Sequence, residues 1–320
     1  MDVSIIIVTW NTCQTTCECL QSIVKQPSKI KYEIILIDNG STDDSVSVIR
    51  EKFPNVRLIE NPENKGFAHA NNQGMKVAKG KYFLLLNSDT LILDRALDKM
   101  FVFAERHPEA GVFGSKLLKF DKTIQPSCFL CPSFFNILLS LFFLNSMFQK
   151  NKICGRERMG WFGGERIIEI EAHSGACLLV RKEAVDQVGM MDDRFFVYGE
   201  DADWCWRFRK SGWKILYNPA PEIIHLKEHT ASAAGPKMQH QLYSGMLQFI
   251  KKHKPFPVYI LSCMGSAVWF FERGVIHLLR ALILSEGRKE SRVMAGVFFD
   301  GFFRSFRGWQ ALRYRQETDV

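Results

Sequence analysis

Polar side chains directly follow three apolar runs of this sequence, at the points where buried strands would end. The clearest run, FLLLNSDT at residues 83–90, passes from four apolar residues to an amide, a hydroxyl and a carboxylate. A single aspartate after a strand is usually a helix cap, but three such strand ends together favour a binding site. The residues concerned are Thr9, Asn11, Asp38, Asn39, Asn87, Ser88 and Asp89.

Two of these carboxylates suit different parts of one ligand. Asp38 can accept hydrogen bonds from a base or a ribose. Asp89 can hold a hard divalent cation, whose other ligands would be diphosphate oxygens and water. A sugar nucleotide has all of these groups.

A second polar cluster lies in FFVYGEDADWCWRFRKSGW, residues 195–213. Glu200 and Asp201 come just before a stretch of helical spacing, in which Asp203 and Arg207 are four residues apart and can pair on the helix surface. The simpler interpretation is that these acidic residues complement the positive end of the helix dipole. The functional interpretation is a general base that accepts the proton of an attacking hydroxyl and that the helix start keeps ionised.

His225 stands in EIIHLKEHTAS, beyond an expected strand and a turn with two prolines. A lone histidine is most often a packing or surface residue. The alternative is an imidazole ligand to the cation that Asp89 would hold.

The elements that must position these residues alternate between strands and helices. This order predicts parallel pairing with right-handed crossovers in a doubly wound sheet that is covered on both faces. Ligands of such sheets bind beyond the carboxyl ends of the strands. The expected strands are residues 3–9, 33–38, 56–59, 81–86 and 214–217, and the expected helices are 13–24, 45–52 and 67–78.

The turn after the first expected strand, TWNTCQT, excludes two nucleotide chemistries. It contains neither G-x-G-x-x-G nor G-x-x-x-x-G-K-S/T, so both dinucleotide hydride transfer and P-loop phosphoryl transfer are disfavoured. A nucleotidyltransferase of similar fold is disfavoured too, because TWNTCQTTCECL has no glycine and no basic residue.

Charge and apolar residues gather in the last quarter of the chain. The net charge is +8, and residues 240–320 hold 12 Lys and Arg against 6 Asp and Glu. Aromatic residues interleave with arginines in VFFDGFFRSFRGWQALRYR, after a charge-free stretch at 255–271. This pattern is typical of helices in a lipid interface, so we expect an anionic membrane surface as partner and no nucleic acid.

A further charge-free stretch covers residues 123–149, with a strongly apolar part only at 134–148. That part is shorter than the roughly 20 residues of a membrane-spanning helix. We expect a segment that dips into the membrane or covers the acceptor. A helix buried against the sheet is the alternative.

The nine cysteines and the first residues favour a cytoplasmic location. The cysteine spacings include one lone C-x-x-C, Cys128 and Cys131, and no second pair, so reduced packing thiols are expected rather than a zinc site. The start MDVSIIIVTW lacks the basic, apolar and small-residue regions of a signal peptide. We therefore expect a protein on the cytoplasmic face of the membrane.

Six blocks of the sequence resemble, in order and spacing, the family-2 glycosyltransferases, most closely their bacterial rhamnosyltransferase-like branch. The blocks are VSIIIVTWN, ILIDNGSTDDS, NKGFAHANNQG, YFLLLNSDT, HSGACLLVRKEAVDQVGMMDDRFFVYGEDADWCWR and GWKILYNPAPEIIH. The resemblance implies a GT-A fold over residues 1–235, a Rossmann-like mixed α/β sheet flanked by helices. Its nucleotide half would be about 1–120 and its acceptor half 121–235, followed by a membrane-associating helical region at 236–320.

The resemblance also assigns roles to single residues. It implies that Asp201 is the general base and that Asp89, at the end of the family's D-x-D motif, holds Mg²⁺ or Mn²⁺ with His225. Asn87 replaces the first aspartate of that motif, so Asp89 is expected to be its sole carboxylate ligand. The stretch HTASAAG, residues 229–235, could close over the donor. The implied donor-binding residues are Thr9, Asn11, Asp38, Asn39, Asn64, Asn71, Asn87, Ser88 and Glu200.

The implied reaction is a single in-line displacement that inverts the anomeric carbon. The donor suggested by the branch is dTDP-L-rhamnose, and the acceptor a lipid-linked saccharide or a polysaccharide. Two alternatives remain open. One is the same fold with a UDP-hexose donor, and the other is a non-catalytic binding protein at a membrane surface. The sequence does not indicate an oligomeric state.

Overall fold

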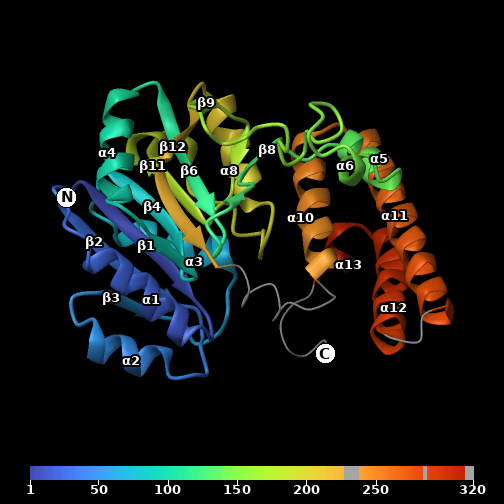
Figure 1. Ribbon diagram of the computed structural model, residues 1–320, viewed down its shortest axis with the longest axis horizontal. Coiled ribbons are helices and arrows are strands. Elements are labelled where there is room, and N and C mark those ends of the chain that lie inside the picture. Colours follow the sequence, from blue (N-terminus) through green and yellow to red (C-terminus); the bar gives the residue numbers. More distant parts are fainter. Residues whose placement is uncertain (227–237, 284–286, 314–320) are drawn as a thin grey trace. The chain divides into compact units, whose positions relative to one another are not determined.

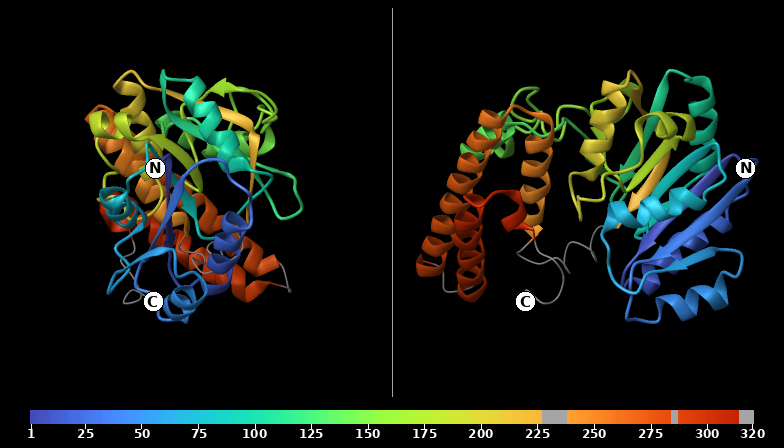
Figure 2. Two further views of the ribbon diagram at one scale, coloured as in Figure 1. Left: turned by 90° about the vertical axis from the view of Figure 1, so that its left-hand side faces the viewer. Right: turned by 180° about the vertical axis from the view of Figure 1, so that it is seen from behind.

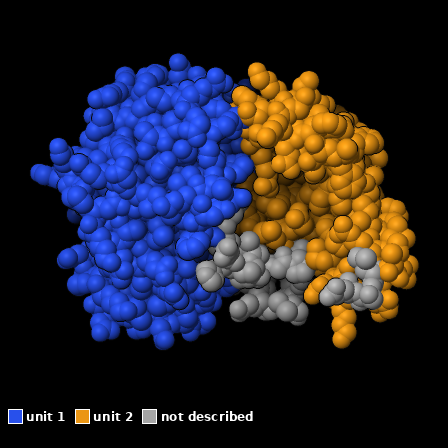
Figure 3. All heavy atoms as spheres, in the orientation of Figure 1, with its two compact units in different colours: residues 1–131, 162–196, 200–229 blue, residues 132–161, 197–199, 230–320 orange. Residues whose placement is uncertain are grey.

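The computed structural model describes residues 1–226, 238–283 and 287–313 of the chain. The chain forms two compact units (Figure 3). We call the first the α/β unit; it consists of residues 1–131, 162–196 and 200–229. The second, residues 132–161, 197–199 and 230–320, is the helical unit. This division differs from the expected boundary at residue 235, because residues 132–161 belong to the helical unit and not to the acceptor half.

Ten strands of the described residues form one mixed sheet in the α/β unit (Figure 1). The order along its main path is β3-β2-β1-β4-β11-β6-β12-β5. The strands of this path are β1 (Val3–Thr9), β2 (Tyr32–Asp38), β3 (Arg57–Glu60), β4 (Tyr82–Asn87), β5 (Thr90–Ile92), β6 (Ala110–Leu118), β11 (Cys177–Arg181) and β12 (Lys214–His225). The short strands β7 (Ile124–Gln125) and β9 (Ile168–Glu169) pair with β6 and β12, and β8 (Cys128–Phe129) pairs with β10 (Ala172–His173).

Helices cover both faces of this sheet because its central strands are apolar on both sides. Ile5 and Ile7 of β1 belong to the core cluster that also contains Leu20 of α1. Ile6 faces the other way, toward α3, where a Cβ on Gly74 would lie only 2.5 Å from an Ile6 methyl carbon. The helices of this unit are α1 (Cys13–Val24), α2 (Ser45–Lys52), α3 (Phe67–Val77), α4 (Ala96–Arg106), α7 (Lys182–Val188) and α8 (Glu200–Lys210).

The expected strands and helices of residues 1–87 are present with nearly the expected bounds, and β1, β2, β3 and β4 are parallel. Two features differ from simple alternation. Strand β11 runs antiparallel between β4 and β6. Strand β12 continues through Pro219 and Pro221 to His225, because a register shift between Asn218 and Glu222 takes up the prolines.

The helical unit contains α5 (Phe134–Leu141), α6 (Leu144–Met147), α10 (Met238–His253), α11 (Phe256–Ile283), α12 (Arg288–Ser305) and α13 (Trp309–Leu312). Helices α11 and α12 lie side by side (Figures 1 and 2). Helix α5 packs on α11, where Trp269 Nε1 donates to Ser140 Oγ at 2.8 Å. The alternative of a helix buried against the sheet is therefore wrong, since α5 finds its apolar partner on α11.

Within the described ranges, no helix combines the length and the apolar content that crossing a bilayer requires. All nine cysteines are free thiols.

Candidate active site

Three strand ends meet in register at one edge of the sheet, as the sequence predicts. In the parallel ladder Thr9 of β1 pairs with Asp38 of β2, and Val8 of β1 pairs with Asn87 of β4. The chain proceeds from β1 to β2 and β3 on one side and then returns to β4 on the other. The carboxyl ends of β1 and β4 thus form a topological switch point, where α/β sheets bind ligands.

Hydroxyl groups connect this edge to the start of α1. Thr9 Oγ1 lies 3.0 Å from Thr12 Oγ1 and 2.8 Å from Thr16 Oγ1. Ser88 Oγ lies 3.2 Å from the same Thr12 hydroxyl. The end of β1, the start of α1 and the turn after β4 therefore hold one another in place. Thr12 and Thr16 thus border the candidate site, although the sequence analysis did not single them out; the threonine-rich start of α1 was the available signal.

Asn11 connects the turn after β1 to the turn after β2. Its backbone is in the left-handed region, with φ of 53°. The Asn11 N–H donates to Ser41 Oγ at 2.9 Å, and its Oδ1 accepts from Thr42 N–H at 2.7 Å. The two turns thereby form one rim beside Asp38.

Asn39 and Asn64 organise the loop that borders the Asp38 side. Asn39 Nδ2 donates to Asn64 Oδ1 at 2.8 Å, while Asn39 Oδ1 accepts from Asn61 Nδ2 at 3.0 Å and from Lys65 N–H at 3.1 Å. Asn61 was also missed, although it directly follows β3 as the other polar residues follow their strands. These side-chain amides hydrogen-bond to other groups of the protein, so their observed contacts fix the shape of the loop beside Asp38.

Three buried oxygens at or near this edge have no hydrogen-bond partner among the residues that the structure describes. They are Asp38 Oδ1, Asn71 Oδ1 and Asn87 Oδ1. The second oxygen of Asp38 accepts from Ser41 N–H at 3.0 Å, and Asn71 Nδ2 donates to the Phe67 carbonyl at 2.9 Å. Buried acceptors without partners are rare in folded proteins, so their presence here indicates places for ligand donors or a cation.

Asp89 and His225 form a close buried pair. Asp89 Oδ1 is 3.3 Å from His225 Nε2, and Asn87 Nδ2 is 3.4 Å from the same nitrogen. Strand pairing brings them together, because β12 aligns His225 with Thr90 and the Leu226 N–H donates to the Asp89 carbonyl at 2.9 Å. Both side chains are at most 7% exposed. The pair expected from the sequence is thus adjacent in space.

This donor set fits a hard divalent cation that also binds a ligand. A carboxylate, an imidazole and the partnerless Asn87 Oδ1 offer oxygen and nitrogen donors of the kind that Mg²⁺ and Mn²⁺ accept. No cluster of three or more His, Cys, Asp and Glu side chains suited to a metal occurs in the described parts of the chain. Asp89, His225 and Asn87 would supply part of a coordination shell, and ligand oxygens and water the rest.

The two acidic residues at the start of α8 lie in different environments. Asp201 is half-buried, and its carboxylate accepts from Ala202 N–H at 2.8 Å and from Gly175 N–H at 3.3 Å. Glu200 is 6% exposed, and its Oε2 has no hydrogen-bond partner within the described ranges. Burial, then the charge of Asp201, raises the pKa of Glu200 to about 8. Burial also raises the pKa of Asp201, while the two N–H donors lower it.

Asp203 and Arg207 pair as expected, with Arg207 Nε 2.9 Å from Asp203 Oδ2. The pair is not on the helix surface, however, because Asp203 is fully buried and Arg207 also donates to the carbonyls of Val188 and Met190. It fixes α8 to the preceding loop and leaves Asp201 as the half-exposed acid of this helix start.

One short segment connects the Asp89 side of the site to Asp201. The Asn87 N–H donates to the Ala176 carbonyl at 3.0 Å, and the neighbouring Gly175 N–H donates to Asp201. Gly175 was missed by the sequence reasoning; the small residues of HSGA before an apolar run were its signal. The candidate metal pair and the candidate base therefore attach to the same edge of the sheet. The HTASAAG segment lies outside the described residues.

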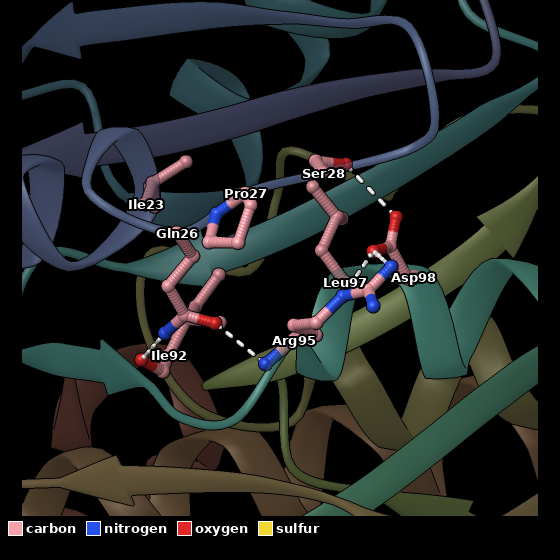
Figure 4. Close-up of a pocket in the computed structure, with 8 residues that line it drawn as sticks. All are labelled: Ile23, Gln26, Pro27, Ser28, Ile92, Arg95, Leu97 and Asp98. Atoms are coloured by element: carbon pink, nitrogen blue, oxygen red, sulfur yellow. Dashed lines mark hydrogen bonds and ion pairs between the residues drawn. The ribbon is translucent and has the colours of Figure 1, made fainter.

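A small pocket of the α/β unit lies at the other end of α1 (Figure 4). Gln26 bonds to the Ile92 carbonyl and accepts from Arg95 N–H, and Asp98 pairs with Arg95 and Ser28 (Figure 4). Because α1 has 12 residues, about 18 Å of helix separates this pocket from Thr12. Its hydrogen bonds connect the end of α1 to the start of α4, and none of the candidate site residues lines it.

Comparison with known proteins gives a consistent assignment. The model of the family "Glycosyl transferase family 2" matches residues 4–141. The chain is 30% identical over 217 residues to the N-acetylglucosaminyl-diphospho-decaprenol L-rhamnosyltransferase of Mycobacterium tuberculosis, covering 62% of this chain and 67% of that protein. It is 38% identical over 112 residues to the poly(ribitol-phosphate) beta-glucosyltransferase of Bacillus spizizenii, covering 33% of this chain and 18% of that protein.

Solved structures share the fold. The mannosyltransferase PcManGT from Pyrobaculum calidifontis, in complex with GDP-Man and Mn²⁺, has a TM-score of 0.56 at 16% identity, covering 95% of this chain and 86% of its own. S. aureus TarS 1–349 has a TM-score of 0.53 at 15% identity, covering 99% and 93%. The fold is of the GT-A type, and the chain belongs to glycosyltransferase family 2, with similarity to its rhamnosyltransferases.

Proposed function

We propose that this glycosyltransferase moves a sugar, with inversion, from dTDP-L-rhamnose to a lipid-linked or polysaccharide acceptor in cell-envelope glycan synthesis. The observation that carries the reaction type is the attachment of the Asp89–His225 pair and of Asp201 to the same sheet edge. The sugar and the acceptor class are taken from the mycobacterial relative, whose name specifies L-rhamnose and a diphospho-decaprenol carrier.

The nucleotide would bind at the ends of β1 and β2. Asp38 Oδ1, which is buried and has no donor in the described part of the chain, would accept a hydrogen bond from the base or the ribose. Thr9, Asn11 and Asn39 shape this end of the site, together with Asn64. Asn71 Oδ1 offers a second hydrogen-bond acceptor to the sugar nucleotide. Ser88 would hold the turn that presents Asp89.

Asp89 and His225, with Asn87 beside them, would hold Mg²⁺ or Mn²⁺. When bound, such an ion neutralises the charge of the diphosphate leaving group. The protein keeps the two side chains buried and aligned through the β5–β12 pairing, so little ordering is needed when the donor arrives.

Asp201 would be the general base. A single displacement requires one carboxylate that accepts the proton of the acceptor hydroxyl, and the half-exposed Asp201 can reach solvent and ligand. Glu200 is less suited, because its raised pKa keeps a large fraction protonated near neutral pH. A neutral Glu200 beside an ionised Asp201 avoids two adjacent buried charges. We assign Glu200 a role in binding the sugar nucleotide and not in proton transfer.

The helical unit would bind the cytoplasmic face of an anionic membrane, where a lipid-linked acceptor is available. One side of α11 exposes large apolar groups at helical spacing, every three or four residues except between Phe271 and Leu278. Basic residues stand beyond both ends of this apolar row, and Arg280 stands within it. The apolar residues are Phe256, Ile260, Met264, Val268, Phe271, Leu278 and Leu282, and the basic ones include Lys251, Lys252, Arg280 and Arg288. Such helices lie in the lipid interface.

A thermal-shift screen against dTDP, UDP and GDP, each with and without Mn²⁺, tests the nucleotide and the cation. We expect dTDP with Mn²⁺ to stabilise most, since a ligand at about 100 times its dissociation constant adds about 2.7 kcal/mol. Transfer from dTDP-L-rhamnose to a polyprenyl-diphosphate saccharide then tests the reaction. Stabilisation by UDP instead would favour a UDP-hexose donor. No metal-dependent nucleotide binding and no released nucleoside diphosphate would favour the non-catalytic binding protein.

A further inference from the structure

His173 is a fully buried titratable residue next to the candidate base that the reaction does not use directly. It lies on β10, and its ring stands between two backbone carbonyls. Nδ1 is 3.0 Å from the Ser174 oxygen, and Nε2 is 2.9 Å from the Ser115 oxygen. Gly114 leaves the space for the ring, because a Cβ there would lie 2.4 Å from His173 Cδ2. The ring is therefore closely confined.

The ring carries one proton at neutral pH. Burial lowers the pKa of His173 to about 4, although both carbonyls oppose this shift. A neutral imidazole has a single N–H. Only one of the two carbonyls can accept a hydrogen bond from it, so the position of the proton matters.

The Ser174 carbonyl belongs to the same peptide group as the Gly175 N–H. In a planar trans peptide these two groups point in opposite directions. A ring that holds the Ser174 oxygen on one side therefore directs the Gly175 N–H to the other side, where Asp201 Oδ2 accepts it at 3.3 Å. His173 thus contacts this peptide on the side opposite to Asp201.

The charge of Asp201 favours the proton on Nδ1. Hydrogen bonds in a chain polarise one another, and this chain leads from Nδ1–H through the peptide group to a carboxylate. Among the described residues, the titratable groups that act on Asp201 or its neighbours include acidic and thiol groups and two arginines. Glu200 and Asp203 are the acids, and Asp203 is paired with Arg207. Cys205, whose pKa burial raises, hydrogen-bonds the His173 backbone, and Arg209, which acts on Cys205, is paired with Glu171.

We propose that His173 is a positioning residue: with its proton on Nδ1 it fixes the Ser174–Gly175 peptide, whose N–H holds Asp201 in place as the base. This inference rests on the proposed role of Asp201. A merely structural role of His173 would affect stability and leave the protonation behaviour of Asp201 unchanged.

A matched pair of substitutions separates the two ring nitrogens. The amide nitrogen of asparagine is two bonds from Cβ, as Nδ1 is, and that of glutamine is three bonds away, as Nε2 is. His173→Asn thus keeps a donor for the Ser174 carbonyl, and His173→Gln keeps one for the Ser115 carbonyl. We expect the acid limb of the kcat–pH profile to stay in place for His173→Asn and to move up by about one pH unit for His173→Gln. The upward direction follows because the carboxylate loses a stabilising donor.

Two outcomes of this experiment overturn the inference: an unchanged acid limb for a folded His173→Gln protein, or equal shifts for both variants. Titration of the Asp201 carboxyl carbon by NMR, identified by its loss in Asp201→Asn, gives the same information without turnover. It remains decisive if the wild-type protein proves to transfer no sugar, a result that would reject the proposed function alone. If a variant does not fold, nitrogen NMR of the His173 ring in the wild-type protein shows which ring nitrogen carries the proton. A proton on Nε2 with none on Nδ1 contradicts the inference.

Discussion

The α/β unit and the helical unit differ in how much large apolar surface they expose and in where buried polar atoms without partners gather. In the α/β unit, the central strands are buried on both faces, and partnerless buried oxygens occur at Asp38, Asn71, Asn87 and Glu200. In the helical unit, large apolar side chains are exposed along α11 and near the ends of α12, with Ile283 77% and Phe303 66% exposed. Among the described residues, most of the exposed large apolar ones belong to this smaller unit.

This difference indicates two kinds of unmet interaction. Buried polar atoms without a partner among the described residues occur in both units, such as Ser266 Oγ in the helical one. At the strand ends of the α/β unit such oxygens gather at the candidate site, where a charged and hydrogen-bonding ligand would supply partners. The helical unit lacks partners for apolar surface, which a lipid interface would supply. Chemistry is thus expected in one unit and attachment in the other.

The largest expected effect tests the base. Asp201→Asn removes the proton acceptor while keeping the shape of the side chain, so kcat should fall by about 10²- to 10⁴-fold. The KM for the donor should change little, because Asp201 is assigned no part in donor binding. Steady-state kinetics with released nucleoside diphosphate as readout measures both. Asp186→Asn, an exposed carboxylate on α7, is the control. Undiminished kcat in Asp201→Asn would place the base elsewhere.

The second-largest expected effect tests whether Asp89 holds a divalent cation. Asp89→Ala removes the only carboxylate expected to hold the ion, so transfer should fall by about a hundredfold or more. The additional thermal stabilisation that Mn²⁺ gives in the presence of nucleoside diphosphate should also disappear. Differential scanning fluorimetry at fixed nucleotide concentration reads this out. If Asp89→Ala protein keeps the Mn²⁺-dependent stabilisation, the buried Asp89–His225 pair has only a structural role.

A smaller effect tests the helical unit. Met264 and Val268 lie one turn apart on α11 and are 54% and 55% exposed. Met264→Glu with Val268→Glu should weaken binding to phosphatidylglycerol vesicles by about tenfold or more, since each apolar side chain contributes about 1.5–3 kcal/mol when fully buried. Co-sedimentation measures the binding. The control is Phe120→Glu, an equally drastic change at an exposed residue of the α/β unit; a similar loss there would remove the contrast between the units.

The smallest expected effect concerns stability and pH. The pKa of Glu200 is raised from 4.5 to about 8 in the folded protein, so folding favours its protonated form. That contribution is fully present below pH 4.5 and is lost as pH rises toward 8. Glu200→Gln removes this dependence and should raise the melting temperature at pH 9 by about 2 °C or more. Equal melting curves of the two proteins at pH 9 would show that Glu200 ionises without cost.

The site was partly predictable because strand ends are local features. An apolar run that stops on Asp or Asn marks both a strand and its end, and the parallel order of β1, β2 and β4 then brings Thr9, Asp38 and Asn87 together. His225 needed more. The sequence suggested it as a ligand, but its approach to Asp89 depends on the antiparallel pairing of β12 with β5, which no local pattern encodes.

The sequence by itself determined the alternating strands and helices, the polar strand ends and the acidic start of α8, because periodicity, β-branched runs and helix-start preferences act over a few residues. Only the tertiary structure decided which of these groups share a site. It placed β11 antiparallel beside β4 and packed α5 on α11. It also formed the hydrogen bonds from the Gly175 N–H to Asp201 and from the Asn87 N–H to the Ala176 carbonyl. These contacts join residues far apart in the chain, and their free energy depends on the packing of the whole unit and not on any one segment.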